Sequence, residues 1–346
     1  DCGRDEQGEA PQSVPSVFES STAKPEETRS SNLMEEILDQ ENIKAAIARV
    51  RRNGGAPGID GLTTESLAPY MIANWEGIRR ELLAGSYKPK PVRRVAIPKP
   101  GGGERHLGIP TVMDRVIQQA FLQILQPQWD NTFCESSYGF RPGRSQHQAI
   151  NAAQVLIKSG YEYVVDIELE KFFDRVNHDI LMSRVAKRVA DKRILKVIRA
   201  YLNAGILEGG LVAPATEGVP QGGPLSPLLS NLMLDDLDKE LEKRHLHFVR
   251  YADDCNIYVK SERAGLRVKA TITKFLAQQL RLKVNEEKSA VGKPSSRTFL
   301  GFTYGTNPNV PRLIAKNSLE RARAKVRELV RVGKRTPLKQ TSETVG

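Results

Sequence analysis

The sequence predicts an α+β fold, in which helices and short strands are mixed without the regular alternation of a doubly wound sheet. Apolar residues recur at helical spacing in four segments, at residues 32–52, 113–125, 228–241 and 319–329. Alternating or short apolar segments that are typical of strands lie at residues 93–98, 163–169 and 248–259. The two kinds of segment follow one another irregularly, which is the order expected of an α+β core.

The N-terminal 31 residues differ in composition from the rest. They are rich in Ser, Glu, Pro and Gly and contain few large apolar side chains, so we expect residues 1–31 to form a disordered leader. The helical pattern over 32–52 then opens the folded part. It should end before the cluster Asn53-Gly54-Gly55-Ala56-Pro57-Gly58, which combines several helix-breaking residues.

The net charge and the cysteine content indicate which classes of protein are compatible with this sequence. The 346 residues include 52 Lys and Arg against 41 Asp and Glu, for a net charge of +11, which favours a polyanionic partner such as nucleic acid. Cys2, Cys134 and Cys255 are far apart and form no CxxC pair, so neither a zinc knuckle nor a disulfide framework is indicated. No apolar run approaches the roughly 20 residues of a membrane span, so we expect a cytoplasmic protein without a membrane partner.

Tyr251-Ala252-Asp253-Asp254 is the sharpest chemical signal. The two acids stand between the apolar stretches of an expected hairpin, where they are badly placed for a core and well placed to hold metal. Phosphoryl transfer by two divalent ions needs carboxylates that hold the ions roughly 3.5 to 4 Å apart, and oxygen ligands suit Mg²⁺. An ordinary Asp-Asp turn between two strands would have the same sequence.

A third carboxylate is available on the segment 163–169. Period two places Asp166 and Glu168 on one face of that strand and Val165, Ile167 and Leu169 on the other. A solvated sheet face would look the same, but the segment is followed by Lys171-Phe172-Phe173-Asp174, whose rings could screen a nucleotide sugar.

Two further features could contact a nucleotide, a run rich in glycine and proline and a set of cations. The run from Gly218 to Pro227 has three glycines and three prolines before a helix, so its backbone could approach a base pair or phosphate closely. A helix-entry loop is the simpler interpretation. Several cations could bind a triphosphate, although each is also typical of a solvated surface. Those that flank the expected turn at 101–103 are Arg93, Arg94, Lys99 and Arg105, and those in the segment Gly139 to Ser145 are Arg141 and Arg144.

Taken in order, these segments resemble the fingers and palm of a bacterial group II intron reverse transcriptase, across residues 32–302. The matching motifs are Gly58-Ile59-Asp60-Gly61, Ile97-Pro98-Lys99-Pro100 with Leu107-Gly108-Ile109-Pro110, Tyr138 to Arg144, Phe172-Phe173-Asp174, Pro220 to Pro224, the Tyr-Ala-Asp-Asp box and Phe299-Leu300-Gly301-Phe302. The resemblance implies a right-hand polymerase whose antiparallel palm sheet carries the acidic hairpin. It divides the chain into the leader (1–31), an N-terminal extension and fingers (32–160), a palm (161–303) and the incomplete start of a thumb or maturase helix (304–346).

The resemblance also implies an activity and its residues. The activity is RNA-directed DNA synthesis from a primer 3′-hydroxyl, with roles in intron splicing and mobility. The implied cofactor is a pair of Mg²⁺ ions on the catalytic residues Asp253, Asp254 and Glu168, with Asp166 as a less favoured ligand. The implied partners are an RNA template such as intron RNA, a DNA primer or target, and deoxynucleoside triphosphates. The nucleotide is expected to contact Lys99, Arg105, Phe173, Gln221, Gly222 and Lys288, and the primer to contact Phe299, Leu300, Gly301 and Phe302.

The chain departs from the family pattern at the third acid. Counting back five positions from Phe173 gives Glu168, where the family usually has Asp, and the extra methylene could displace a metal ligand by about 1 Å. Asp166 is then an alternative ligand. The chain also ends soon after Phe302, so the resemblance covers only the first thumb helix and includes no nuclease motif.

Three other functions remain compatible with these residues. An RNA-directed RNA polymerase can share the acid pair, but Phe173 should exclude the 2′-hydroxyl that such an enzyme accepts. A maturase that has lost polymerase activity through Glu168 would use the basic surface for intron RNA alone. A relative recruited to CRISPR spacer acquisition or phage defence would carry the same motifs.

Overall fold

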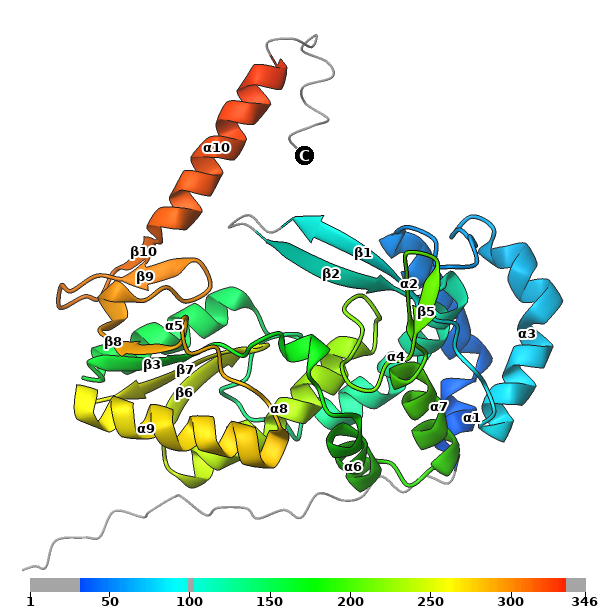
Figure 1. Cartoon of the computed structure of the whole chain (residues 1–346), viewed down its shortest axis with the longest axis horizontal. Coiled ribbons are helices and arrows are strands. Elements are labelled where there is room, and N and C mark those ends of the chain that lie inside the picture. The colour runs from blue at the N-terminus through cyan, green and yellow to red at the C-terminus, as the bar shows by residue number, and fades with distance from the viewer. Residues whose placement is uncertain (1–31, 99–102, 334–346) are drawn as a thin grey trace, which may run out of the picture.

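The computed structural model describes residues 32–98 and 103–333 (Figure 1). The expected leader over 1–31, the turn around Lys99 and the last residues of the chain lie outside these ranges. Mixed helices and antiparallel strands confirm the predicted α+β class. None of the helices in the described ranges has the length and apolarity needed to span a membrane.

Three helices open the described chain. They are α1 (Leu33–Ile37), α2 (Gln40–Asn53) and α3 (Leu67–Ala84). The helical pattern over 32–52 is confirmed, and it forms two helices, α1 and α2, which are divided at Asp39. Its carboxylate accepts hydrogen bonds from the backbone N–H groups of Glu41 and Asn42 and so caps α2. As predicted, α2 ends at the glycine cluster, with Gly54 at its C-terminal boundary.

A four-stranded sheet forms the upper part of the molecule beside these helices (Figure 1). Its strands lie in the order β2-β1-β4-β5. Their bounds are β1 (Val92–Pro98), β2 (Glu104–Ile109), β4 (Ile206–Glu208) and β5 (Leu211–Ala213). Strand β1 is the strand predicted over 93–98, and it pairs with β2 as an antiparallel hairpin.

The core between the two sheets is helical. Its elements are α4 (Val112–Asp130), the short 3₁₀ turn η1 (Phe172–Asp174), α6 (His178–Arg188), α7 (Lys192–Leu202) and α8 (Ser226–Lys243). Helix α4 packs against α2, and α6 packs against both α7 and α8. Buried apolar side chains of α4 and α8 join a large cluster that extends to the second sheet. The predicted helices over 113–125 and 228–241 are therefore confirmed and lie at the centre of the fold.

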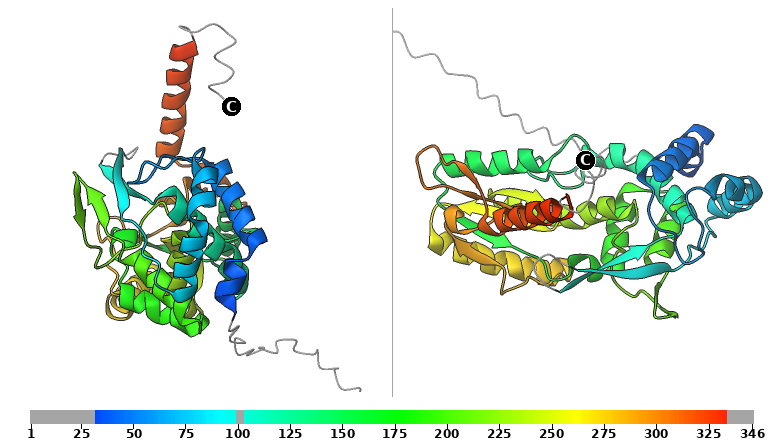
Figure 2. Two further views of the ribbon diagram at one scale, coloured as in Figure 1. Left: turned by 90° about the vertical axis from the view of Figure 1, so that its right-hand side faces the viewer. Right: turned by 90° about the horizontal axis from the view of Figure 1, so that it is seen from above.

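The second sheet has the strand order β6-β7-β3-β8, with all neighbouring strands antiparallel. The strands are β3 (Tyr163–Ile167), β6 (His247–Tyr251), β7 (Asp254–Val259) and β8 (Ala290–Gly292). One face is covered by α9 (Glu262–Phe275) with its extension η2 (Leu276–Leu280), and α5 (Gln146–Lys158) packs on the other face at β6. Seen from above, α5 and α9 flank this sheet (Figure 2).

Coverage by α5 corrects the simple picture of one apolar and one polar face. Val164 and Tyr258 share the face of Asp166, yet both are buried, in a cluster with Ile150 of α5. The strand is also shorter than predicted and ends at Ile167. Only the end of this face beyond Val164 is left for carboxylates.

The last described elements rise from the sheet edge. A short 3₁₀ turn, η3 (Pro294–Ser296), precedes the hairpin of β9 (Phe302–Tyr304) and β10 (Arg312–Ile314). The predicted amphipathic helix over 319–329 is confirmed as α10 (Lys316–Gly333), which projects away from the body (Figures 1 and 2). Its apolar residues Leu319, Val326 and Val330 are exposed.

Candidate active site

The pairing of β3 with β7 brings the predicted acids together. Asp166 pairs with Asn256 and Ile167 with Cys255, so continuing the register by one residue sets Glu168 opposite Asp254. Paired residues of antiparallel strands point to the same face, and residues two apart on one strand share a face. Asp166, Glu168 and Asp254 therefore lie on one face of the sheet, and Asp253 follows at the tip of the β6–β7 hairpin.

Crowding of these carboxyl groups perturbs Asp254. Desolvation by the surrounding protein, and then the charges of Asp253, Glu168 and Asp166, raise the pKa of Asp254 from 3.8 to about 7. Lys288 opposes this effect only in part. Although the side chain of Asp254 reaches solvent, its carboxyl group lies in a strongly anionic environment, which is the environment expected of a cation site.

Two cations already neutralise part of this charge. Lys288 Nζ lies 2.5 Å from Glu168 Oε1, and Arg297 donates to Asp166 Oδ2 at 2.6 Å. Burial nevertheless raises the pKa of Asp166, against the effect of Arg297. In the ranges that the structure describes, no three carboxylate, His or Cys side chains converge closely enough to hold a metal ion as they stand.

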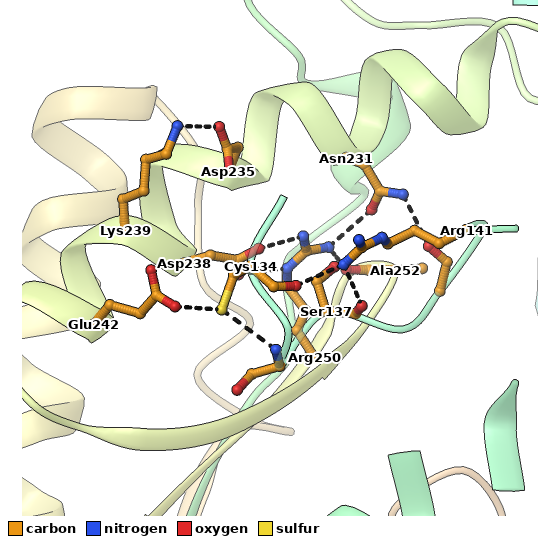
Figure 3. A network of polar contacts seen from close by, with 12 residues as sticks. Cys134, Ser137, Arg141, Asn231, Asp235, Asp238, Lys239, Glu242, Arg250 and Ala252 are labelled. Atoms are coloured by element: carbon orange, nitrogen blue, oxygen red, sulfur yellow. Dashed lines mark hydrogen bonds and ion pairs between the residues drawn. The ribbon is translucent and has the colours of Figure 1, made fainter. Parts of the chain in front are cut away.

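The acidic hairpin is anchored by Arg250, whose side chain is fully buried (Figure 3). Its Nε and Nη2 donate to the two carboxylate oxygens of Asp238 at 2.7 and 2.6 Å. Its Nη1 donates to Asn231 Oδ1 and, at 2.8 Å, to the carbonyl oxygen of Ala252. Burial alone would lower the pKa of Arg250, but Asp238 outweighs burial and raises it. The guanidinium thus fixes the carbonyl group next to Asp253.

The segment of Ser136 to Phe140 packs against the same turn. Backbone hydrogen bonds join Arg250 N to Ser136 O and Tyr138 N to Arg250 O, both at 2.9 Å. A Cβ at Gly139 would lie only 2.2 Å from Ala252 N, and Asn231 donates to Gly139 O at 2.8 Å. Ala252 itself has a φ of 56°, in the left-handed region. The glycine is needed here because the two backbones touch.

A cavity of about 540 Å³ is lined by three of the predicted nucleotide contacts, Phe173, Gln221 and Gly222. Phe173 is mostly buried, and its ring packs edge to face on Phe172 with centroids 5.2 Å apart. A second cavity, of about 240 Å³, shares Phe173 and Gln221 with the first. The Phe173 ring therefore sits between two hollows, where its volume can limit what enters.

The loop that contains Gln221 approaches a strand closely. Gly108 N donates to Gln221 O at 2.8 Å, and a Cβ at Gly222, whose φ is 133°, would lie 2.6 Å from Gly108 O. The loop thus packs closely on β2, and its expected approach to a base pair or phosphate stays a prediction. The segment Phe299 to Phe302 forms a tight turn, with Phe299 N donating to Phe302 O at 2.8 Å and Phe302 N to Phe299 O at 2.9 Å.

Most of the cations suggested for triphosphate binding have other roles. Arg141 is buried, pairs with Asp130 and donates to the carbonyl groups of Cys134 and Ser137, so it stabilises the fold. Three more have partners within the protein. Arg93 donates to the carbonyl oxygen of Pro57, Arg94 forms an ion pair with Glu208, and Arg144 forms an ion pair with Glu135. Lys99 and the side chain of Arg105 lie outside the described residues, so their expected role stays a prediction.

Sequence reasoning missed the supporting residues Arg250, Asn231, Asp238 and Arg297. One signal was available, because Arg250 interrupts the apolar strand Phe248-Val249 directly before the acidic box. A charged residue in a buried strand needs a partner. Its partners lie 12 and 19 residues away on α8, a relation that no local pattern reveals.

Comparison with known proteins identifies the family. The family model "Reverse transcriptase (RNA-dependent DNA polymerase)" matches residues 97–304. Protein YkfC of Escherichia coli (strain K12) is 34% identical over 296 residues, covering 74% of this chain and 78% of YkfC. The group II intron-encoded protein LtrA of Lactococcus lactis subsp. cremoris is 28% identical over 345 residues, covering 76% of this chain and 57% of LtrA.

Solved structures agree on the fold. Apo telomerase from Candida tropicalis superimposes with a TM-score of 0.51 at 15% identity, covering 71% of this chain and 54% of the telomerase chain. This likeness supports the right-hand arrangement of fingers and palm. A domain of the matched family implies a polymerase that depends on divalent metal ions and binds a nucleic-acid template. The chain belongs to the reverse transcriptase family and is related to the proteins encoded by group II introns.

Proposed function

We propose that this chain is an RNA-directed DNA polymerase that extends a primer 3′-hydroxyl on an RNA template. The observation that carries the proposal is the β3–β7 register, which sets Glu168 opposite Asp254 beside the hairpin tip at Asp253. The cavity lined by Phe173 and Gln221 offers room for a nucleotide. Acids for catalysis and a shaped space for the substrate are the two requirements of nucleotidyl transfer.

Asp253, Asp254 and Glu168 are proposed to hold two Mg²⁺ ions. These donors fit a hard divalent cation because all are carboxylate oxygens. Burial, and then the charges of the neighbouring acids, raise the pKa of Asp254, and a cation would relieve the repulsion among these charges. Bound ions would supply activation of the primer hydroxyl and neutralisation of triphosphate charge. Lys288 holds Glu168 in the metal-free protein, and after releasing it Lys288 can donate to the departing pyrophosphate.

The other residues predicted to bind substrates are proposed to contact the nucleotide and the primer. Phe173 excludes the ribose 2′-hydroxyl by its volume, and Gln221 and Gly222 pack on the incoming nucleotide. Lys99 and Arg105 hold the triphosphate, which they would favour further as charge develops during transfer. The turn from Phe299 to Phe302 contacts the primer.

We further propose that the template is group II intron RNA and that the chain acts in intron splicing or mobility. The similarity to LtrA supports this role. The chain spans only 57% of LtrA and 40% of the similar COX1/OXI3 intron 1 protein of Saccharomyces cerevisiae. Functions of the complete intron proteins therefore enter here as proposals.

Primer extension by the purified chain tests the polymerase function. With Mg²⁺, an RNA template and a DNA primer, the parent should incorporate deoxynucleotides in preference to ribonucleotides. Asp253→Ala and Asp254→Ala should abolish extension and leave RNA binding and folding nearly intact. Asp179→Ala is the matched control, because Asp179 is an exposed carboxylate on α6 whose partner is Arg199. Substantial extension by either hairpin variant would contradict the metal assignment.

One observation favours a second function, that of an intron RNA-binding maturase without polymerase activity. Glu168 replaces the usual Asp, and Lys288 already neutralises it. Such a protein would bind intron RNA tightly, with an affinity that falls steeply as salt rises, and would extend no primer with Mg²⁺ or Mn²⁺. That combination of results would replace the polymerase proposal with this one.

A further inference from the structure

Phe140 combines two features that are unusual for a large aromatic residue, an exposed side chain and a left-handed backbone conformation. Its side chain is 43% exposed, and its φ is 60°, in the left-handed region that is unfavourable for a residue other than glycine. Two helices hold it in this conformation, because Gln126 of α4 donates to Phe140 O and Asn231 of α8 donates to Gly139 O. A strained backbone that neighbouring elements maintain points to a role outside folding.

The ring lines the 540 Å³ cavity that Phe173 and Gln221 also line. None of the described residues that line this cavity is acidic, and two are cations, Arg49 and Arg115. Arg115 is committed to the carbonyl groups of Gly54 and Ala56, and so it fixes the loop after α2 against the cavity. Arg49 is exposed, and its side chain has no hydrogen-bond partner within the described ranges.

Arg52 follows Arg49 by three residues on α2, so it shares the same helix face, and it is also exposed. A strand that leaves the cavity along this face of α2 would pass Arg52. An exposed aromatic ring in a cavity whose described lining carries cations and no acids is the combination that binds single-stranded nucleic acid, since bases stack on the ring and phosphates contact the cations.

We propose that Phe140 stacks on the unpaired template base that lies next to the templating base. This inference rests on the proposed function and adds a residue that positions the template. The contacts of Gly139 with Ala252 tie the ring to the acidic hairpin, so a base stacked on Phe140 is held at a fixed place relative to Asp253. The ring would therefore set the register of the template in the site.

Binding without chemistry tests this proposal. Two primer-template duplexes are compared in the absence of nucleotides, one blunt and one with a 5′ RNA overhang, and affinity is measured by fluorescence anisotropy. Phe140→Asn removes the ring and keeps a side chain that tolerates the left-handed conformation. Loss of a stacked base is worth about 1–3 kcal/mol, so this variant should bind the overhang duplex about 5- to 150-fold more weakly.

Affinity for the blunt duplex should stay unchanged, and Phe140→Trp should bind the overhang as the parent does. Val155→Ala, at an exposed apolar residue of α5, is the control and should change neither affinity. A 2-aminopurine at the first overhang position should be quenched by the parent and not by Phe140→Asn.

Equal weakening on both duplexes, or equal quenching by parent and variant, would overturn the proposal. So would an effect of Phe140→Asn confined to the KM for deoxynucleotides, because the ring would then contact the incoming nucleotide. A parent that binds the overhang through Phe140 but extends no primer would contradict the polymerase function and leave this inference standing.

Discussion

Replacing Gly139 by alanine should displace the acidic hairpin without unfolding the protein. The added Cβ would lie 2.2 Å from Ala252 N, 2.9 Å from Tyr251 C and 3.0 Å from Ala252 Cα. Ordinary contacts between such atoms are about 3.5 Å, so one backbone must move by about 1 Å. All three atoms belong to the main chain, and no rotamer change can relieve the overlap.

A shift of about 1 Å at the catalytic groups costs on the order of a hundredfold in rate, and overpacking costs about 1–3 kcal/mol in stability. Single-turnover primer extension measures the rate, and urea unfolding measures the stability. Gly77→Ala is the control, because no atom lies within 4 Å of its Cβ position on α3, and it should extend primers as the parent does. A folded Gly139→Ala protein that extends primers at the parental rate would refute the reasoning.

Three more predictions concern the site. Glu168→Asp should preserve or raise extension, Glu168→Ala should nearly abolish it, and Asp166→Ala should cost much less, because Arg297 already neutralises Asp166; the reverse ranking would assign the third ligand to Asp166. Phe173→Ala should raise the use of ribonucleotides relative to deoxynucleotides in competition assays, and an unchanged preference would move the gate to another residue. Asp254→Asn should stabilise the metal-free protein above pH 7 and not near pH 4. The folded pKa of about 7 exceeds the ordinary 3.8, so ionisation penalises the folded state progressively across that window. Allowing for solvent screening, we expect a gain of about 1–2 kcal/mol, or a few degrees in Tm, in thermal melts with chelator, and equal melting at pH 8 would contradict it.

The sequence predicted the elements best where one local pattern determines them. The apolar stretches on either side of the acids in 248–259 predicted the hairpin with its acids at the tip, and helical periodicity predicted α4, α8 and α10. It did not locate the boundary between α1 and α2, where the Asp39 side chain caps the second helix. It also failed at Val164, which is buried because α5, encoded earlier in the chain, covers the polar face.

The acidic residues of the candidate site could be predicted from the sequence, but the cations that pair with them could not. Glu168 and Asp254 could be named from motifs, but their juxtaposition depends on strands separated by more than eighty residues. The ion pair of Lys288 with Glu168 joins residues 120 positions apart, and that of Arg297 with Asp166 joins residues 131 positions apart. Arg141 shows the opposite error, because a cation in a binding-like motif proved to be a buried structural group.

The anchoring of Arg250 limits how this site could be transplanted by protein engineering. A graft of the β6–β7 hairpin alone would carry Arg250 without its buried counterion Asp238. Removing one partner of a buried ion pair typically lowers the stability of the folded protein by about 3–5 kcal/mol. The transferable unit must include Asp238 and Asn231 of α8 and the segment around Gly139. Design of new polymerases from this chain should treat these three segments as a single module.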